Sequence, residues 1–151
     1  MQLSRFYVNI FRMEKALIRK TKVSQAVLEI LKGYKKPISI GQIKAQLQKE
    51  ALTPNKTTLY RIMDKLKDKG DVQEIVFKNG VTYYEWIAAQ HHHHHHHFFC
   101  TVCEKIACMT SCILEKAGLN LKALLPNKKY QLNSHEFHLY GTCDNCHGVE
   151  A

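Results

Sequence analysis

The sequence contains no apolar run near the roughly 20 residues that a membrane-spanning helix requires. It also lacks the order of a secretory signal peptide at its start, because Arg5, Arg12 and Arg19 are spread among apolar residues. We therefore predict no membrane association and a cytoplasmic location. In a reducing compartment, the six cysteines favour metal binding over disulfide bonds. No Ser/His/Asp order and no Cys/His pair stands apart from a metal-ligand pattern, so an enzyme is not expected.

Acidic residues are scarce, at 13 against 22 lysines and arginines, which gives a formal net charge of +9. The whole excess lies in residues 1–90, where 17 basic residues face 8 acidic ones, whereas residues 91–151 hold five of each. A basic half joined to a neutral half rich in cysteine and histidine suggests a polyanion-binding module linked to a metal-binding module. A solvated lysine-rich surface would give the same balance, so charge alone does not decide.

Apolar spacing predicts helices in the first part of the chain. One covers residues 3–18, and a second begins near Val23 and ends at Gly33. A third begins at Ser39, where a glutamine three residues later completes a capping box. A fourth covers residues 56–69, with Thr53 or Asn55 as its expected cap and Gly70 after its end.

Two strand-like runs follow, residues 72–77 and 81–87, joined through Asn79-Gly80, a strong hairpin signal. Helices followed by a two-stranded hairpin are typical of a winged helix-turn-helix, in which the hairpin is the wing. We predict an α+β protein in three parts: an N-terminal winged helix-turn-helix domain over residues 1–88, a histidine-rich metal-binding hinge over 89–97, and a small C-terminal α/β domain over 98–151.

The fourth predicted helix is the candidate DNA-reading element. Its inner face is apolar, and its outer face carries Lys56, Thr57, Thr58, Tyr60, Arg61 and Lys65. A recognition helix places side chains near its N-terminus on base edges and flanking cations on phosphates. Arg61 could pair with a guanine through two hydrogen bonds, and Thr58 and Tyr60 could contact a thymine methyl group or a phosphate. An exposed basic helix would look similar, but the wing that follows favours DNA binding.

Two Cys-x-x-Cys pairs supply the ligand number and type of one tetrahedral zinc: Cys100, Cys103, Cys143 and Cys146. The 39 residues between the pairs exceed the gap in a compact zinc ribbon, so the pairs must meet through tertiary folding. That arrangement suits a structural zinc. Isolated cysteines are usually small buried hydrophobic residues, but two such pairs rarely are.

The first cysteine pair is preceded by seven consecutive histidines, His91–His97. The run resembles an expression tag, although tags stand at chain ends, and its first three members would equally suit a redundant metal-scavenging loop. If the rest of the run is extended, its side chains alternate between two faces. His95 and His97 then point one way and His94 and His96 the other, which predicts two metal sites on opposite faces.

Ligands from elsewhere must complete both sites. The candidates are Glu85 or Cys108 for the first histidine pair, and Glu115 and His135 for the second. Each of them could instead be an ordinary solvated side chain. Cys112 and His138 are near enough to consider, but we interpret them as packing or surface groups.

Together these features resemble the ferric uptake regulator family over nearly the whole chain. The resemblance rests on Thr57-Thr58-Leu59-Tyr60-Arg61, on the His-x-His before the first cysteine pair, and on His135 with the ending Leu139-Tyr140-Gly141-x-Cys143-x-x-Cys146. It implies a homodimeric, metal-activated repressor that binds a double-stranded DNA operator. In that family a winged-helix DNA-binding domain precedes a dimerisation domain, here residues 98–151.

The resemblance also implies roles for individual residues. By position, the four paired cysteines match structural zinc ligands, and Glu85, His95 and His97 match sensor ligands between the domains. His94 and His96, with Glu115 and His135, match a further metal site in the dimerisation domain. Tyr60 and Arg61 match DNA-contacting positions.

The chain departs from the family pattern at several places. Lys36-Pro37-Ile38 stands where the family usually supplies a sensor histidine, Cys108 stands where many members carry a glutamate, and Ser24-Gln25 replaces the usual arginine of an early helix. The histidine run is also longer than usual in the family.

Cys108 bears on the choice of metal. Two imidazoles, a thiolate and Glu85 form a fairly soft tetrahedral site that suits Zn²⁺ better than Fe²⁺ or Mn²⁺. We therefore expect a zinc-responsive repressor of metal-homeostasis genes, with a structural Zn²⁺ and a second divalent metal as effector, bound by Glu85, His95, His97 and Cys108. Iron or peroxide sensing within the same family stays open, as does a zinc-storage or chaperone protein.

Overall fold

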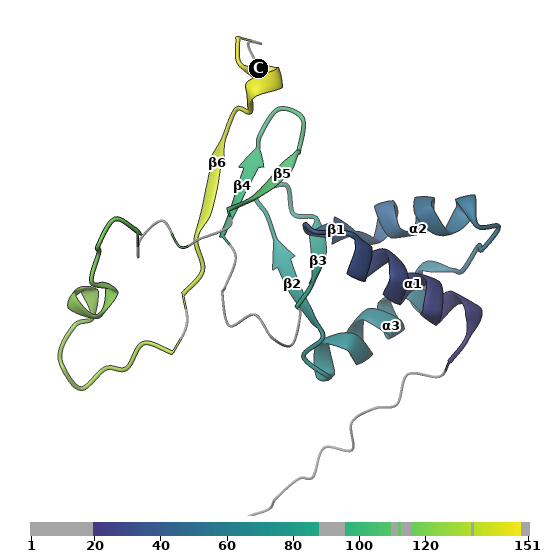
Figure 1. Cartoon of the computed structure of the whole chain (residues 1–151), viewed down its shortest axis with the longest axis horizontal. Coiled ribbons are helices and arrows are strands. Elements are labelled where there is room, and N and C mark those ends of the chain that lie inside the picture. Colours follow the sequence, from purple (N-terminus) through teal and green to yellow (C-terminus); the bar gives the residue numbers. More distant parts are fainter. Residues whose placement is uncertain (1–19, 88–95, 110–111, 113–115, 134, 149–151) are drawn as a thin grey trace, which may run out of the picture.

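The structure is a computed structural model that describes residues 20–87, 96–109, 112, 116–133 and 135–148 (Figure 1). The helix predicted over residues 3–18 lies outside these residues. Three helices pack together at one side, and a second sheet lies at the other, with a hairpin between them (Figure 1). Within the described residues, no helix has the length and apolar character to cross a bilayer.

The three helices begin at side-chain caps. They are α1 (Lys22–Gly33), α2 (Ile40–Lys49) and α3 (Lys56–Asp68). The predicted capping box of α2 is confirmed: the Gln42 N–H donates to Ser39 Oγ at 3.3 Å, and the Ser39 N–H donates to Gln42 Oε1 at 2.9 Å. Asn55, rather than Thr53, caps α3, since the Thr58 N–H donates to its Oδ1 at 2.8 Å.

The three helices share one apolar core. Its fully buried side chains include Val27 and Leu31 of α1, Ile43 and Leu47 of α2, and Leu59, Met63 and Leu66 of α3. The face of α3 predicted to be inner is therefore the buried one. Burying each such side chain contributes about 1.5–3 kcal/mol to folding, so this core fixes which face of α3 is left to solvent.

A hairpin follows α3 as predicted. It joins β2 (Val72–Val76) to β3 (Thr82–Trp86), and the two-residue strand β1 (Ile38–Ser39) pairs with the other edge of β3. Gly80 adopts a positive φ of 72° in the turn, where its N–H donates to the Phe77 carbonyl at 2.9 Å. We call β2, β3 and their turn the wing hairpin.

The wing hairpin is buried on both faces. Val72 and Tyr84 pack in the helical core, whereas Ile75, Phe77 and Tyr83 pack with side chains of the second sheet. Successive residues of a strand point to opposite faces, so β3 alternates between the two cores along its length. The hairpin is therefore a shared layer between the two parts of the molecule.

The second sheet contains β4 (His96–Cys100), β5 (Ile106–Met109) and β6 (His138–Gly141), in the order β5-β4-β6. We call it the C-terminal sheet. β4 is antiparallel to β5 and parallel to β6. The described residues of this part also include two short 3₁₀ helices, η1 (Leu121–Leu124) and η2 (Asp144–Cys146). The α+β fold with a winged helix-turn-helix and a small C-terminal α/β part is confirmed, whereas the exact domain boundaries stay a prediction.

Candidate metal centres

Four sulfur atoms meet at one end of the C-terminal sheet. Cys100 ends β4, and its register partner Gly141 in β6 brings the second cysteine pair beside the first. The four Sγ atoms of Cys100, Cys103, Cys143 and Cys146 lie within 4.8 Å of one another. We call this group the cysteine cluster. The parallel pairing of β4 with β6 is thus the tertiary contact that closes the gap of 39 residues.

The geometry of the cysteine cluster suits a zinc ion. Zinc with bonds of about 2.3 Å to four sulfurs needs sulfurs about 3.8 Å apart, and the Cys103 and Cys143 Sγ atoms are 3.6 Å apart. Backbone N–H groups point at the sulfur of Cys100, and the Cys143 N–H lies 3.3 Å from it. These donors, that of Cys103 first, lower the pKa of Cys100 to about 6. They therefore favour the thiolate that a metal requires.

A second group joins the wing hairpin to the C-terminal sheet. Glu85 comes from β3, His97 from β4, and Cys108 from β5, where it is the register partner of His97. The His97 Nε2 and Glu85 Oε2 atoms are 3.2 Å apart, and Cys108 Sγ lies 3.8 Å from Glu85 Oε1. We call these three residues the interdomain cluster. Their ligand atoms lie within 4.8 Å of one another.

Burial makes the interdomain cluster a candidate for a metal. His97 is 1% exposed and Glu85 7% exposed. Within the described part of the chain, His97 Nδ1 has no hydrogen-bond partner, and the Glu85 carboxylate 3.2 Å from Nε2 does not meet hydrogen-bond geometry. A buried polar atom without a partner is costly, and a coordinated cation would remove that cost. His95, predicted to share this site, lies outside the described residues.

A third group lies around the neighbouring histidine of β4. His96 Nε2 is 3.3 Å from Cys112 Sγ, which in turn is 3.5 Å from His135 Nε2. We call these residues the His96 cluster. His96 and His97 therefore serve different groups, as alternation along an extended strand predicts. His94 and Glu115, the other residues predicted for this site, lie outside the described residues.

Cys112 is the residue that sequence reasoning missed. We interpreted it as a packing or surface group, but it is 6% exposed and lies between two imidazoles. With Cys112 included, all six cysteines of the chain belong to one of the three groups. The signal was present in the sequence, because Cys112 was the one thiol left without a role in a segment rich in metal-ligand residues.

Comparison with known proteins tests the resemblance. The model of the ferric uptake regulator family matches residues 15–140. The chain belongs to the ferric uptake regulator family. This family contains metal-responsive transcription regulators, and membership confirms the resemblance drawn from the motifs. Comparison with curated proteins gives no match.

Solved structures of the family share the fold. The chain is similar to the Francisella tularensis ferric uptake regulator with iron, at 19% identity and a TM-score of 0.72, over 97% of this chain and 99% of that one. It is similar to the Helicobacter pylori ferric uptake regulator, described as having three functional metal binding sites, at 19% identity and a TM-score of 0.72, over 89% and 85% of the two chains. The Campylobacter jejuni peroxide stress regulator is 26% identical, with a TM-score of 0.60 over 82% and 88%.

In this family member, metal binding at the interdomain cluster is expected to depend steeply on pH. Burial, followed by the charge of Glu85, raises the pKa of Cys108 to about 11, so the metal-free thiol is protonated at neutral pH. A metal must displace that proton, and the competition weakens as pH rises. We expect zinc affinity to increase by about tenfold for each pH unit between pH 7 and 9, by linkage of one proton to one metal. Competition titrations with a zinc-binding dye measure it.

The control for this prediction is Cys108→Asp. An aspartate carboxylate is already ionised at pH 7, so this variant should lose most of the slope while still binding metal. Equal slopes in the wild type and the Cys108→Asp variant would show that Cys108 is not the proton-releasing ligand.

His138 lies beside the interdomain cluster without joining it. It is the register partner of His97 in β6, and the two rings stack with centroids 5.8 Å apart. Its Nε2 is 3.9 Å from Glu136 Oε2. Burial, and then the neighbouring His97, lower the pKa of His138, so a neutral imidazole lines this side of the cluster.

The outer face of α3 presents the residues predicted to contact DNA. Lys56, Thr57, Thr58, Tyr60 and Arg61 are exposed, and Lys65 is half-buried. The Thr58 hydroxyl donates to Asn55 Oδ1 at 2.8 Å, so it also serves the cap of the helix. Within the described residues, no ion pair engages Arg61 or Lys56. Their charges are thus available to an anionic partner.

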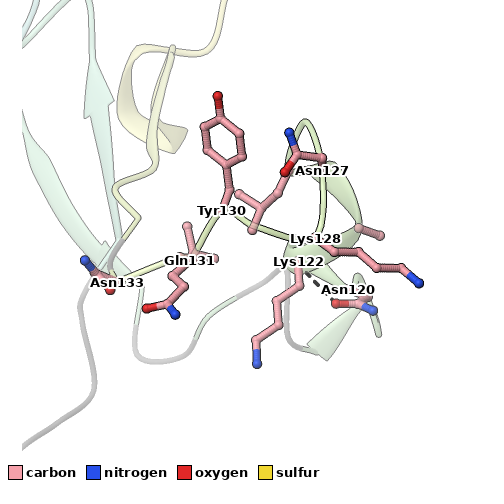
Figure 2. A pocket seen from close by; sticks show the side chains of 10 residues that line it. Asn120, Lys122, Asn127, Lys128, Tyr130, Gln131 and Asn133 are labelled. Carbon is pink, nitrogen blue, oxygen red and sulfur yellow. Dashed lines mark hydrogen bonds between the residues drawn. The ribbon is translucent and has the colours of Figure 1, made fainter.

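A cavity of about 780 Å³ lies between η1 and the segment that follows it (Figure 2). Asparagines, lysines and apolar side chains line it, among them Lys122, Lys128 and Tyr130. Among the described residues, its lining contains no thiol, imidazole or carboxylate.

Proposed function

We propose that this regulator is a zinc-responsive transcriptional repressor that controls metal-homeostasis genes. The observation that carries the proposal is the interdomain cluster, in which a wing residue, Glu85, approaches His97 and Cys108 of the C-terminal sheet. Metal held there would link the DNA-binding part to the rest of the chain. His95 is proposed as a further ligand of the same site.

The donor atoms favour zinc as the effector. A thiolate, an imidazole and a carboxylate form a fairly soft set, which suits tetrahedral Zn²⁺ better than Fe²⁺ or Mn²⁺. The His96 cluster also contains a thiol, Cys112, beside its two imidazoles. We propose it as a third metal site, with His94 and Glu115 as further ligands. The cysteine cluster is proposed to hold the structural zinc.

Regulation would follow from the position of Glu85 on the wing hairpin. A metal shifts the population toward one conformation only if it binds that conformation more tightly than the others. Glu85 can reach His97 and Cys108 only when the wing hairpin lies against the C-terminal sheet. Metal binding would therefore favour the one orientation of α3 in which these three residues lie together.

The DNA partner is proposed from the exposed face of α3. Arg61 would read a guanine edge, and Lys56 and Lys65 would contact phosphates. A homodimer would present two such helices to half-sites about one helical turn apart on an operator.

Homodimer formation is supported by large apolar side chains that are exposed to solvent in the single chain. Leu124 is 78% exposed, Tyr130 57% and Leu119 56%. Large exposed apolar side chains gathered in one segment mark protein interfaces. A second copy is proposed as the partner that covers them.

Operator binding with and without metal tests the function. A duplex selected by the protein from random-sequence DNA would be titrated with protein that retains only the structural zinc, alone and with Zn²⁺, Mn²⁺ or anaerobic Fe²⁺. We expect Zn²⁺ to tighten binding by about 100-fold, within the usual range of allosteric coupling. Arg61→Ala should weaken binding at every zinc concentration, and Lys105→Ala, at an exposed lysine of the C-terminal part outside the proposed dimer surface, should not.

Other outcomes of this experiment identify the alternatives. Tightening by Fe²⁺ or Mn²⁺ but not by Zn²⁺ would replace zinc sensing by iron, manganese or peroxide sensing. Equal affinity with and without every metal would end the sensor proposal. Several weakly bound zinc ions with only non-specific DNA affinity would indicate a zinc store.

A further inference from the structure

Phe77 is the residue through which the wing hairpin enters the C-terminal sheet. It directly follows β2 and is 2% exposed, whereas its neighbour Val76 is 56% exposed. Its ring stacks on that of Phe99 in β4, with centroids 5.0 Å apart and planes inclined by 22°. It also meets Tyr83 of its own hairpin edge-on at 5.4 Å. The ring therefore belongs to the wing by sequence and to the C-terminal sheet by packing.

The same ring covers the imidazole of the interdomain cluster. Phe77 meets His97 at 6.0 Å and His138 at 5.2 Å, with interplanar angles of 86° and 90°. His138 stacks against another side of His97, and Glu85 approaches its Nε2. The orientation of the His97 ring is thus set by two residues of the wing hairpin, Phe77 and Glu85, and by one of β6.

Two contacts from one hairpin restrict its orientation more than one contact does. Phe77 and Glu85 lie on the same face of the wing hairpin, the face that also carries the register partners Ile75 and Tyr83. Glu85 lies near the base of the hairpin, and Phe77 lies at its turn. A link at Glu85 alone would let the hairpin pivot about that point. The packed ring of Phe77 restricts this pivot, together with Ile75 and Tyr83, which pack in the same cluster as Phe99 and Ile106.

We infer that Phe77 is a positioning residue that holds His97 in its metal-binding orientation and couples metal binding at the interdomain cluster to the orientation of the wing. This inference rests on the proposed function. A metal that fixes His97 also fixes the surface on which Phe77 packs. It thereby restricts the orientation of the whole wing hairpin relative to the C-terminal sheet. Without the ring, metal bound at Glu85 would hold the wing hairpin, and α3 with it, less firmly against the C-terminal sheet, because Ile75 and Tyr83 alone would still pack there.

The test is the ratio of operator dissociation constants without and with Zn²⁺. A purely structural role of Phe77 would weaken both states equally and leave the ratio unchanged. We expect Phe77→Ala to reduce the ratio at least tenfold and Phe77→Leu, which keeps an apolar side chain without the ring, to reduce it less. Val76→Ala is the matched control on the exposed side of the hairpin and should keep the wild-type ratio. The absorption spectrum of bound Co²⁺ reports the orientation of His97 independently, and it should change only in the Phe77 variants.

Each result has one meaning. Circular dichroism and zinc content first establish whether the Phe77→Ala variant is folded. If it is not folded, the ratio measured for the Phe77→Leu variant is used to test the inference. A wild-type ratio retained in the folded Phe77 variant, even with both affinities shifted, overturns the inference and leaves the proposed function intact. A wild-type protein with a ratio of one contradicts the proposed function itself.

Discussion

Replacing Cys100 by serine is expected to unfold the C-terminal sheet. Cys100 is fully buried at the end of β4, and its sulfur faces the backbone N–H of Cys143 in the second cysteine pair. Zinc bound by such sites contributes about 10–16 kcal/mol in small zinc domains, which is comparable with the 5–15 kcal/mol that stabilises a typical domain. A serine hydroxyl does not replace a thiolate ligand, so the loss should exceed the margin of stability. We expect zinc content to fall by about one equivalent per chain and the thermal transition of this part to disappear.

Elemental analysis and calorimetry measure this effect. Val102→Ser is the matched control, because Val102 lies between the first two cysteines, is 38% exposed and supplies no ligand atom. It should keep both the zinc and the transition. A Cys100→Ser protein that melts like the wild type, with its full zinc content, would remove the structural role assigned to the cysteine cluster.

Replacing His97 by alanine is expected to abolish the metal-dependent gain in operator affinity while the protein stays dimeric. His97 is the central residue of the interdomain cluster, since Glu85 comes from one side and Cys108 is its register partner. Loss of a direct ligand should weaken zinc binding by more than the roughly 10–100-fold typical of outer partners. The structural zinc should remain, because Cys100 and its three partners do not involve this imidazole.

Operator binding and zinc competition measured on the same preparation test this expectation. His147→Ala is the control, as His147 is exposed and belongs to none of the three clusters. It should bind zinc and operator like the wild type. A His97→Ala variant that still responds fully to zinc would mean that the effector metal binds elsewhere, and the His96 cluster would be the next site to examine.

Local signals allowed much of the fold to be predicted. The caps of α2 and α3 and the turn at Gly80 depend on residues within a few positions of each other, so the sequence contains what determines them. The meeting of the two cysteine pairs was predictable for another reason, because four thiolates at that spacing have few other roles. The alternation of side chains along an extended segment also predicted that His96 and His97 point to opposite faces and contact different groups.

Contacts distant in sequence could not be predicted in the same way. The parallel pairing of β4 with β6 sets His97 beside His138, and no local pattern indicates parallel register. Cys112 lies beside His96 and His135 only because the tertiary fold brings these distant parts of the chain together. The second buried face of the wing hairpin did leave a trace, since β3 carries aromatic residues on both faces, Tyr83 on one and Tyr84 and Trp86 on the other. A strand open to solvent on one face would alternate with polar residues instead.

Seven identical residues in a row contain no information about which of them enters β4. A shift of two positions would still offer an imidazole to each face, and a shift of one would exchange the two faces. The choice of His96 and His97 must therefore come from Cys100, which lies three residues beyond His97 and is committed to the cysteine cluster. In this chain the sulfur-bound ion would fix the register of the imidazoles: by holding the far end of β4, it would determine which two members of the repetitive tract enter the strand.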